Sequence, residues 1–195
     1  MKMNKHLIIA LFTLLTYAGT AQEKIHWMSW DEMIQQREKD SVKKKIFIDF
    51  YTGWCGWCKK MDKSTFLDPT VVSYMNANYY AVKFDAETRD TIVFNNTMFT
   101  NTDPNFVKSS PRSRGKTHWF AYSLLDGQLS YPSYVILDEN FVRVTIIKGY
   151  KNQEALLANL LFFAKQEYKY YHNYLNELWR KSLQKQQAEQ AKGGK

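Results

Sequence analysis

The feature of this sequence that most constrains its fold is a pair of cysteines placed just after an apolar run. Cys55 and Cys58 are the only cysteines among the 195 residues, and the run over 46–51 (IFIDFY) ends shortly before them. Such a run is typical of a strand covered on both faces, and a helical pattern follows Cys58. The pair therefore lies at a strand-to-helix junction. Two cysteines also exclude a disulfide-stapled miniprotein and a four-thiolate zinc site.

Capping signals and apolar runs divide the rest of the chain into alternating helices and strands. Ser29 and Glu32 form a capping box that begins a helix running to about Asp40, and Asp68-Pro69 begins another that reaches Asn76. The other expected elements are strands over 79–84, 134–137 and 142–148, and helices over 117–125 and from about 152 onward. This order predicts an α/β fold with a central mixed β-sheet flanked by helices.

Two segments depart from this alternation. Residues 88–116 are rich in polar and basic residues without clear periodicity, so we expect a long inserted loop. Farther on, an apolar stripe from Leu157 to Leu178 predicts one long helix, extended over about 166–183, with a polar tail at 184–195. The stripe fits either a helix that folds back over the body or a contact with a partner or second copy.

Residues 1–21 have the pattern of a secretory signal peptide. A short basic start precedes an apolar segment over 7–15, and small residues stand before Gln22, the expected first residue after cleavage. The apolar segment is shorter than the roughly 20 residues of a membrane-spanning helix. We therefore expect a periplasmic or secreted protein without a membrane span after cleavage, with its folded domain over 22–183.

The formal charge of +8 raises nucleic acid and anionic membranes as partners. Loss of the signal peptide lowers this charge to +6, and the remaining lysines are dispersed without a recognition motif. We therefore expect no nucleic-acid partner. Within the inserted loop, a group of basic residues either shapes partner choice or keeps the loop solvated: Lys108, Arg112, Arg114 and Lys116.

A Cys-x-x-Cys pair occurs at zinc, haem and redox sites, and the neighbouring residues separate these alternatives. The residue after Cys58 is Lys59, where attachment of c-type haem requires histidine. His26, His118 and His172 lack the paired spacing that would complete a zinc site. An inert disulfide is a further alternative, although a bridge that closes so short a loop adds little stability. The sequence favours reversible oxidation, with no metal or other cofactor.

In a redox site each of three residues has a role. Cys55 lies at the N-terminus of the predicted helix, where free amide donors and partial positive charge favour a thiolate nucleophile. Cys58 lies one turn inside the helix and acts as the resolving thiol. Asp49 is an ionisable residue inside an apolar strand, so desolvation raises its pKa and fits it for proton exchange with Cys58. An exposed position at a strand end is the alternative for Asp49.

The segment 48–59 (IDFYTGWCGWCK) resembles the thioredoxin family, whose pattern is a strand with a buried acid followed by WCxxCK. The resemblance covers roughly residues 25–165. It implies a thioredoxin-like fold, with Cys55 as nucleophile, Cys58 as resolving cysteine and Asp49 as the proton-transfer carboxylate. It also implies a substrate surface comprising Trp54, Gly56, Trp57, Tyr131, Pro132 and Gly149, and supporting residues Lys83 and Tyr51. Pro132 is then a cis proline beside the disulfide; an ordinary trans proline is the alternative.

One residue departs from the family pattern, because Trp57 stands where the family usually has proline. Residues between the cysteines tune the reduction potential, so the direction of electron flow stays open. We expect an exported thiol–disulfide oxidoreductase that acts on protein disulfides. Because the sequence has no third cysteine, its electrons must come from a redox partner. The alternative is a thioredoxin-like binding or chaperone module with little redox turnover.

Overall fold

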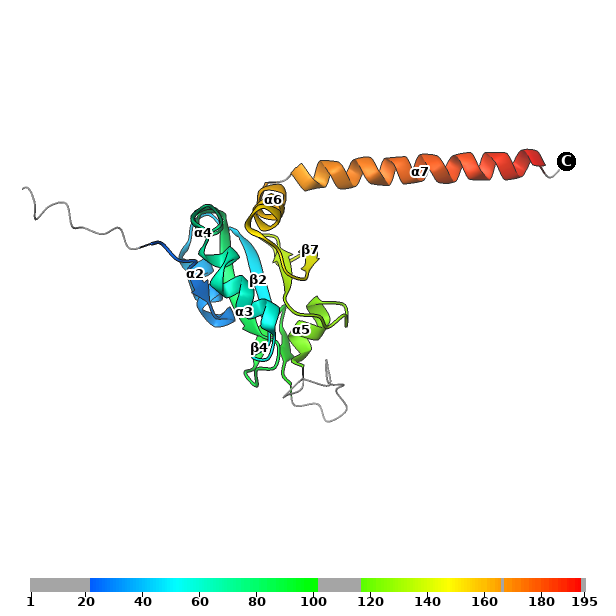
Figure 1. Ribbon diagram of the computed structural model, residues 1–195. Helices are drawn as coiled ribbons and strands as arrows, with labels where there is room; N and C mark the ends of the chain where they lie inside the picture. The colour runs from blue at the N-terminus through cyan, green and yellow to red at the C-terminus, as the bar shows by residue number, and fades with distance from the viewer. Residues whose placement is uncertain (1–21, 102–116, 166, 194–195) are drawn as a thin grey trace, which may run out of the picture.

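A five-stranded mixed sheet forms the centre of the molecule (Figure 1). The computed structural model describes residues 22–101, 117–165 and 167–193. The strand order is β1-β3-β2-β6-β7, with the first three strands parallel and the last two joined by antiparallel pairing. The strands are β1 (Trp27–Met28), β2 (Lys45–Tyr51), β3 (Tyr79–Asp85), β6 (Ser133–Leu137) and β7 (Arg143–Lys148). The mixed sheet predicted from the sequence is thus confirmed.

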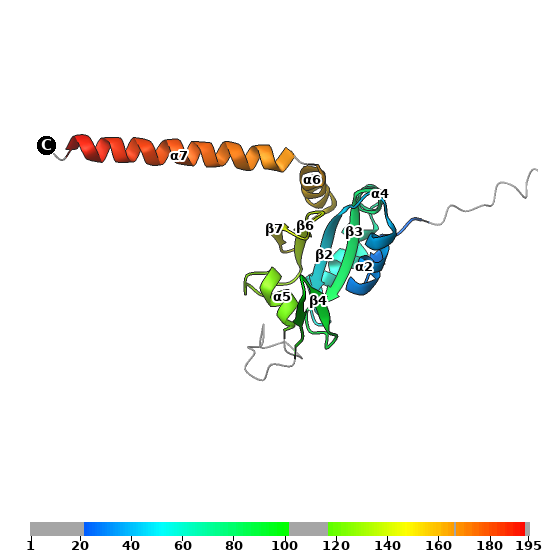
Figure 2. The same ribbon diagram turned by 180° about the vertical axis from the view of Figure 1, so that it is seen from behind.

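Helices cover both faces of this sheet, as the two opposite views show (Figures 1 and 2). On one face Trp30 of α2 and Phe120 of α5 belong to the same apolar cluster. On the other face Met61 of α3, Met75 of α4 and Leu156 of α6 form a second cluster. The helices are α2 (Trp30–Lys39), α3 (Gly56–Lys63), the 3-10 turn η2 (Thr65–Leu67), α4 (Pro69–Asn78), α5 (Trp119–Leu124) and α6 (Gln153–Ala164). Strand β2 is therefore covered on both sides, as its apolar run predicts.

The predicted helix starts are confirmed by their caps. Ser29 Oγ accepts a hydrogen bond from the Glu32 N–H, and the Glu32 carboxylate accepts one from the Ser29 N–H. The Asp68 carboxylate accepts from the Val71 N–H at the start of α4, with Pro69 in the first helical position. Each cap satisfies backbone donors that a helix start leaves free, so these boundaries follow from local sequence.

The prediction that residues 88–116 form an inserted loop is wrong for its first part. Strands β4 (Ile92–Phe94) and β5 (Thr97–Phe99) pair as an antiparallel hairpin. Asn95 and Asn96 join them, with φ values of 48° and 59°. Two consecutive residues at positive φ make the tight turn that matches the twist of a hairpin, and asparagine tolerates this conformation well.

The hairpin is attached to the apolar cluster under α2 and α5. Ile92 is buried, and the Phe94 ring lies 5.6 Å from the Trp30 ring and 5.5 Å from the Phe120 ring. The Trp30 indole N–H also donates to the Val93 carbonyl at 3.1 Å. The segment thus closes one edge of the core instead of lying loosely over it.

Two predictions fall on residues outside the described ranges. The signal peptide was expected over 1–21, and the basic group of the inserted loop lies within 102–116. Both stay predictions.

The single long C-terminal helix predicted from the apolar stripe is two helices. Helix α6 ends at Ala164, and Lys165 has extended backbone with φ −90° and ψ 170°. Helix α7 (Glu167–Gly193) then runs in a new direction (Figures 1 and 2). The polar segment over 184–193 is accordingly helical, where the sequence predicted a tail.

Only the start of α7 packs against the body. The Tyr168 side chain is buried, with its ring 5.8 Å from that of Phe163. The following turns extend away from the sheet (Figure 1), and Trp179 is 64% exposed. Of the two alternatives for the apolar stripe, a helix whose extra turns fold back over the body is therefore wrong. Within the described ranges, no helix is both long and apolar enough to cross a membrane.

The hairpin turn gives a test of the corrected segment. Asn96→Val should lower the free energy of unfolding by about 1–2 kcal/mol, because a β-branched side chain resists positive φ. Asn96→Gly should leave stability close to that of the wild type, since glycine adopts this conformation readily. Urea unfolding of the three proteins measures both. A valine variant as stable as the glycine variant would contradict the turn.

Candidate active site

A disulfide lies at the junction of β2 and α3. Cys55 and Cys58 are joined with an S–S distance of 2.11 Å, and each is only 4% exposed. Cys55 is the N-cap of α3, and the Cys58 N–H donates to Cys55 Sγ at 3.0 Å. When the bridge is reduced, this donor and the helix N-terminus stabilise negative charge on the Cys55 sulfur. The geometry favours a thiolate at the first cysteine.

Asp49 is buried within β2, with 2% of its side chain exposed. It shares a face of the sheet with Phe47, which belongs to the cluster under α3, α4 and α6. Burial raises the pKa of Asp49 to about 7, because water no longer solvates its charge. Asp49 Oδ1 has no hydrogen-bond partner within the described part of the chain. The exposed alternative is excluded, and the carboxyl can exchange a proton near neutral pH.

Lys83 links Asp49 to a second carboxylate that sequence reasoning missed. Lys83 lies opposite Asp49 in the β2–β3 register, with Nζ 3.6 Å from Asp49 Oδ2. The same Nζ donates to Asp62 Oδ1 of α3. The charge of Asp62 raises the pKa of Asp49, whereas that of Lys83 lowers it. Lys83 Nζ also lies 5.3 Å from the centroid of the Tyr51 ring, so the second predicted supporting residue adjoins Lys83.

A local signal for Asp62 was present in the sequence. Asp62 stands four residues after Cys58, and side chains at this spacing lie on the same face of a helix. A helix that turns its resolving cysteine toward β2 therefore turns this carboxylate toward β2 as well. What the sequence lacked was the register that brings Lys83 to the same place.

Four of the predicted substrate-surface residues are brought together around the disulfide. The Tyr131–Pro132 peptide bond is cis, as the resemblance implied. The Gly149 N–H donates to the Pro132 carbonyl at 2.8 Å, with Gly149 at a φ of 76°. The Tyr131 ring meets the Trp54 ring edge-on at 6.1 Å. The β6 and β7 ends of the sheet are thus joined to the cysteine segment.

The other two predicted residues lie on the outer side of the disulfide. Gly56 begins α3 and is exposed, with open space where a Cβ would stand. Trp57 is 56% exposed, and its ring lies 5.4 Å from that of Tyr150. Lys60 Nζ lies 5.0 Å from the Trp57 ring centroid and 4.7 Å from the Tyr150 centroid. Tyr150 and Lys60 were not predicted as site residues.

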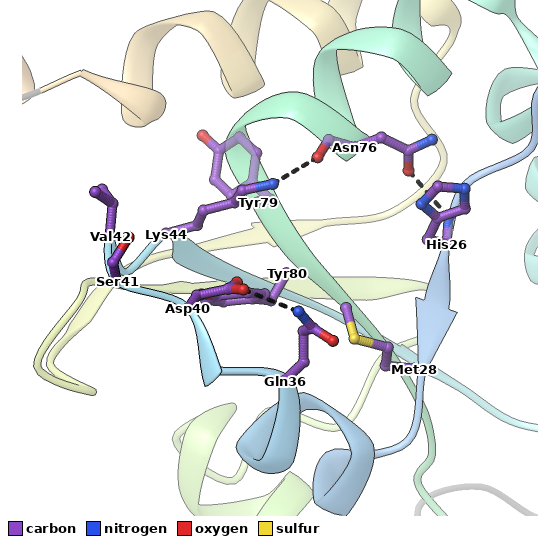
Figure 3. Close-up of a pocket in the computed structure, with 10 residues that line it drawn as sticks. All are labelled: His26, Met28, Gln36, Asp40, Ser41, Val42, Lys44, Asn76, Tyr79 and Tyr80. Atoms are coloured by element: carbon purple, nitrogen blue, oxygen red, sulfur yellow. Dashed lines mark hydrogen bonds between the residues drawn. The ribbon is translucent and has the colours of Figure 1, made fainter. Parts of the chain in front are cut away.

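A surface hollow of about 530 Å³ lies at the other end of the strands (Figure 3). Its lining includes Tyr79 and Tyr80 at the start of β3, whereas the disulfide follows the end of β2. Gln36 and Tyr80 both donate to the Asp40 carboxylate there. These bonds lower the pKa of Asp40. The hollow is thus separate from the redox site. Among the described residues, no group of three or more His, Cys, Asp or Glu could hold a metal ion.

This chain is similar to several known proteins. Residues 14–103 match a family model named Thioredox_DsbH and described as "Protein of unknown function, DUF255". A protein of Caenorhabditis elegans, itself uncharacterised, is 33% identical over 69 residues, which are 35% of this chain. The chain spans 9% of that relative's length.

Three solved structures are similar in fold. A DsbH oxidoreductase is 16% identical, with 76% of this chain and 89% of that chain covered at a TM-score of 0.46. A thioredoxin from Thermus thermophilus is 13% identical, with 74% and 90% covered at 0.49. The C-terminal domain of DsbD from Neisseria meningitidis, in its reduced form, is 16% identical, with 67% and 90% covered at 0.41.

Burial of the Asp49 carboxyl predicts a pH-dependent stability difference. The pKa is about 7 in the folded protein against an ordinary 3.8. The folded state therefore binds this proton more tightly, and wild-type stability falls as pH rises through that window. Asp49→Asn removes this titration. The unfolding free energy of the variant minus that of the wild type should therefore rise by about 1–3 kcal/mol between pH 5 and pH 8. Urea unfolding of the oxidised proteins checks this; a constant difference would contradict it.

The shared lysine predicts an effect of Asp62 on Asp49. Asp62→Asn removes one negative charge and leaves Lys83 to pair with Asp49 alone, so the titration midpoint of Asp49 should fall by about one pH unit. Carbon-13 NMR of labelled aspartate carboxyls in the oxidised protein measures this midpoint. Glu154→Gln, which removes an exposed charge from α6, should leave it in place. An unchanged midpoint in the Asp62 variant would remove this residue from the network.

Proposed function

We propose that this chain is a thioredoxin-family protein and, within that family, an exported thiol–disulfide oxidoreductase acting on protein disulfides. The observation that carries the proposal is the Cys55–Cys58 bridge at the start of α3, combined with the buried carboxyl of Asp49 on the face that α3 covers. A bridge that only stabilised the fold would need neither a helix N-terminus at one sulfur nor an ionisable group in the core.

In the proposed reducing direction the reaction has two exchanges. The Cys55 thiolate attacks one sulfur of the substrate disulfide, forming a mixed disulfide and releasing the first substrate thiolate. The Cys58 thiolate then attacks the Cys55 sulfur, which releases the second substrate thiolate and forms the Cys55–Cys58 bridge. Two electrons pass from the protein dithiol to the substrate disulfide. The released thiolates take protons from the site or from water.

Asp49 serves the second exchange as a proton acceptor. Cys58 is buried, so its thiol must lose a proton without direct access to water. A carboxyl whose pKa is near 7 can accept that proton at neutral pH and return it later. Lys83 and Asp62 are positioning residues in this scheme, because they act through Asp49. Tyr131, Pro132 and Gly149 form the edge where a substrate segment lies against the disulfide.

Two further parts of the proposal concern the protein's surroundings. Its signal-like start places the protein in the periplasm or outside the cell, and its domain begins near Gln22. Electrons are supplied or accepted by a separate redox protein, since this sequence contains no third cysteine. The exposed face of α7 is a surface on which such a partner can bind.

A binding or chaperone module with little turnover is the second candidate. The observation that favours it is the row of exposed aromatic side chains on α7, which a purely catalytic domain does not need: Tyr170, Tyr171, Tyr174 and Trp179. Measured turnover separates the two candidates.

Insulin reduction with dithiothreitol as donor tests the enzyme. Wild-type protein should accelerate it, Cys55→Ser should abolish the acceleration, and Cys58→Ser should accumulate a mixed disulfide that mass spectrometry detects. Equal inactivity of wild type and Cys55→Ser across several disulfide substrates would overturn the proposal in favour of the binding module. The reduction potential then gives the direction: a value near about −270 mV indicates a reductase, and one near about −120 mV an oxidant.

A further inference from the structure

A small exposed surface borders the disulfide and is built from two segments of the chain. It consists of Trp57 and Lys60 of α3 and of Tyr150, which follows β7; we call it the aromatic–lysine ledge. The two rings lie 5.4 Å apart, and Lys60 Nζ stands within 5.0 Å of both centroids. Attraction between the ammonium and the ring faces holds the three side chains together.

The ledge adjoins the place where a substrate would lie. Trp57 stands between the two cysteines in the sequence, and Tyr150 directly follows Gly149. Gly149 is hydrogen-bonded to the carbonyl of Pro132, at the edge described above. A chain segment that presents its own cysteine sulfur to Cys55 therefore passes the ledge.

The charge of the ledge is not neutralised. Lys60 has neither an ion pair nor a hydrogen bond from Nζ within the described part of the chain, although an ammonium carries three donors. Lys59 and Lys63 on the same helix are exposed and also lack a carboxylate within 4.0 Å among the described residues. By contrast, Lys83 lies between two carboxylates. The ledge thus presents an ordered ammonium group whose N–H donors can bind an anionic group.

Acidic side chains lie beside Trp54, which directly precedes Cys55. The Trp54 indole N–H donates to the Glu87 carboxylate at 3.0 Å. The Asp85 carboxylate accepts a hydrogen bond from the backbone N–H of Glu87. The Lys60 side is the side that attracts a substrate carboxylate.

We propose that the aromatic–lysine ledge binds a carboxylate side chain located close to the cysteine of a protein substrate. This inference rests on the proposed function and names its substrate class: disulfides flanked by Asp or Glu. Lys60 lies about one and a half turns beyond Cys55, roughly 8 Å along the helix. An extended peptide rises about 3.3 Å per residue, so the carboxylate belongs within about three residues of the substrate cysteine.

Peptide twins that differ in one charge test the ledge. Each peptide carries one cysteine as a mixed disulfide with 2-mercaptoethanol, with Glu or Gln at one position within three residues of it. The second-order rate constant with reduced wild-type protein should be at least fivefold larger for the best Glu peptide than for its Gln twin at low ionic strength. The advantage should shrink in high salt. Equal rates for every pair of twins would overturn the ledge.

Three lysine variants show whether Lys60 is the residue responsible. Lys60→Gln should remove the preference for Glu, and Lys60→Arg should retain it. Lys63→Gln, which removes the same charge from the same helix away from the rings, should keep both the preference and the basal rate. A preference that survives in Lys60→Gln, or that Lys63→Gln loses to the same extent, would contradict a specific role of Lys60.

A neutral small substrate separates failure of the ledge from failure of the proposed function. Hydroxyethyl disulfide has no flanking residue, so its reduction by wild-type protein reports exchange at Cys55 alone. Reduction of this compound without any Glu preference overturns only the ledge. No reaction with it or with any peptide overturns the proposed function and the ledge together.

Discussion

Burial of one carboxyl group in the central strand is the constraint on which the active-site end of the molecule depends. Strand β2 is paired on both edges and covered on both faces, so the Asp49 side chain has no route to water. Its neighbour across the β2–β3 register is Lys83, and that ammonium is shared with Asp62 of α3. Burial removes water from the Asp49 carboxyl, and the one nearby positive charge is shared with Asp62, so Asp49 is not held ionised and can bind or release a proton.

The two halves of the sheet contribute different parts of the site around the disulfide. The parallel half brings the cysteines, Asp49 and Lys83 together, because β2 leads directly into α3 and β3 lies beside β2. The antiparallel half brings the backbone edge, since the bond from Gly149 to Pro132 ties the end of β7 to the start of β6. Neither half alone surrounds the sulfur atoms. The mixed sheet is thus a requirement of the site as well as of the core.

The features that could be predicted from the sequence are those fixed by neighbouring residues. The caps of α2 and α4, the run of β2 and the cysteine junction each depend on a few consecutive side chains. The β4–β5 hairpin was missed because its turn is Asn95-Asn96, a weaker signal than Asn-Gly, inside a polar segment. The break at Lys165 was missed because the apolar stripe continues across it. The link from Asp62 to Asp49 requires the strand register, which no local pattern contains.

Trp57, between the two cysteines, lacks the fixed φ angle of proline but has a larger side chain that contacts its neighbours. Trp57 is the second residue of α3, and proline is well tolerated in the first turn of a helix because the backbone N–H there has no partner within the helix. Tryptophan does not fix the φ angle in this way. The hydrogen bond from the Cys58 N–H to Cys55 Sγ stabilises the helix start. In return its indole reaches Tyr150 and Lys60, one beyond β7 and one on α3. The substitution therefore leaves the helix start intact while it adds an aromatic, positively charged face beside the sulfur atoms.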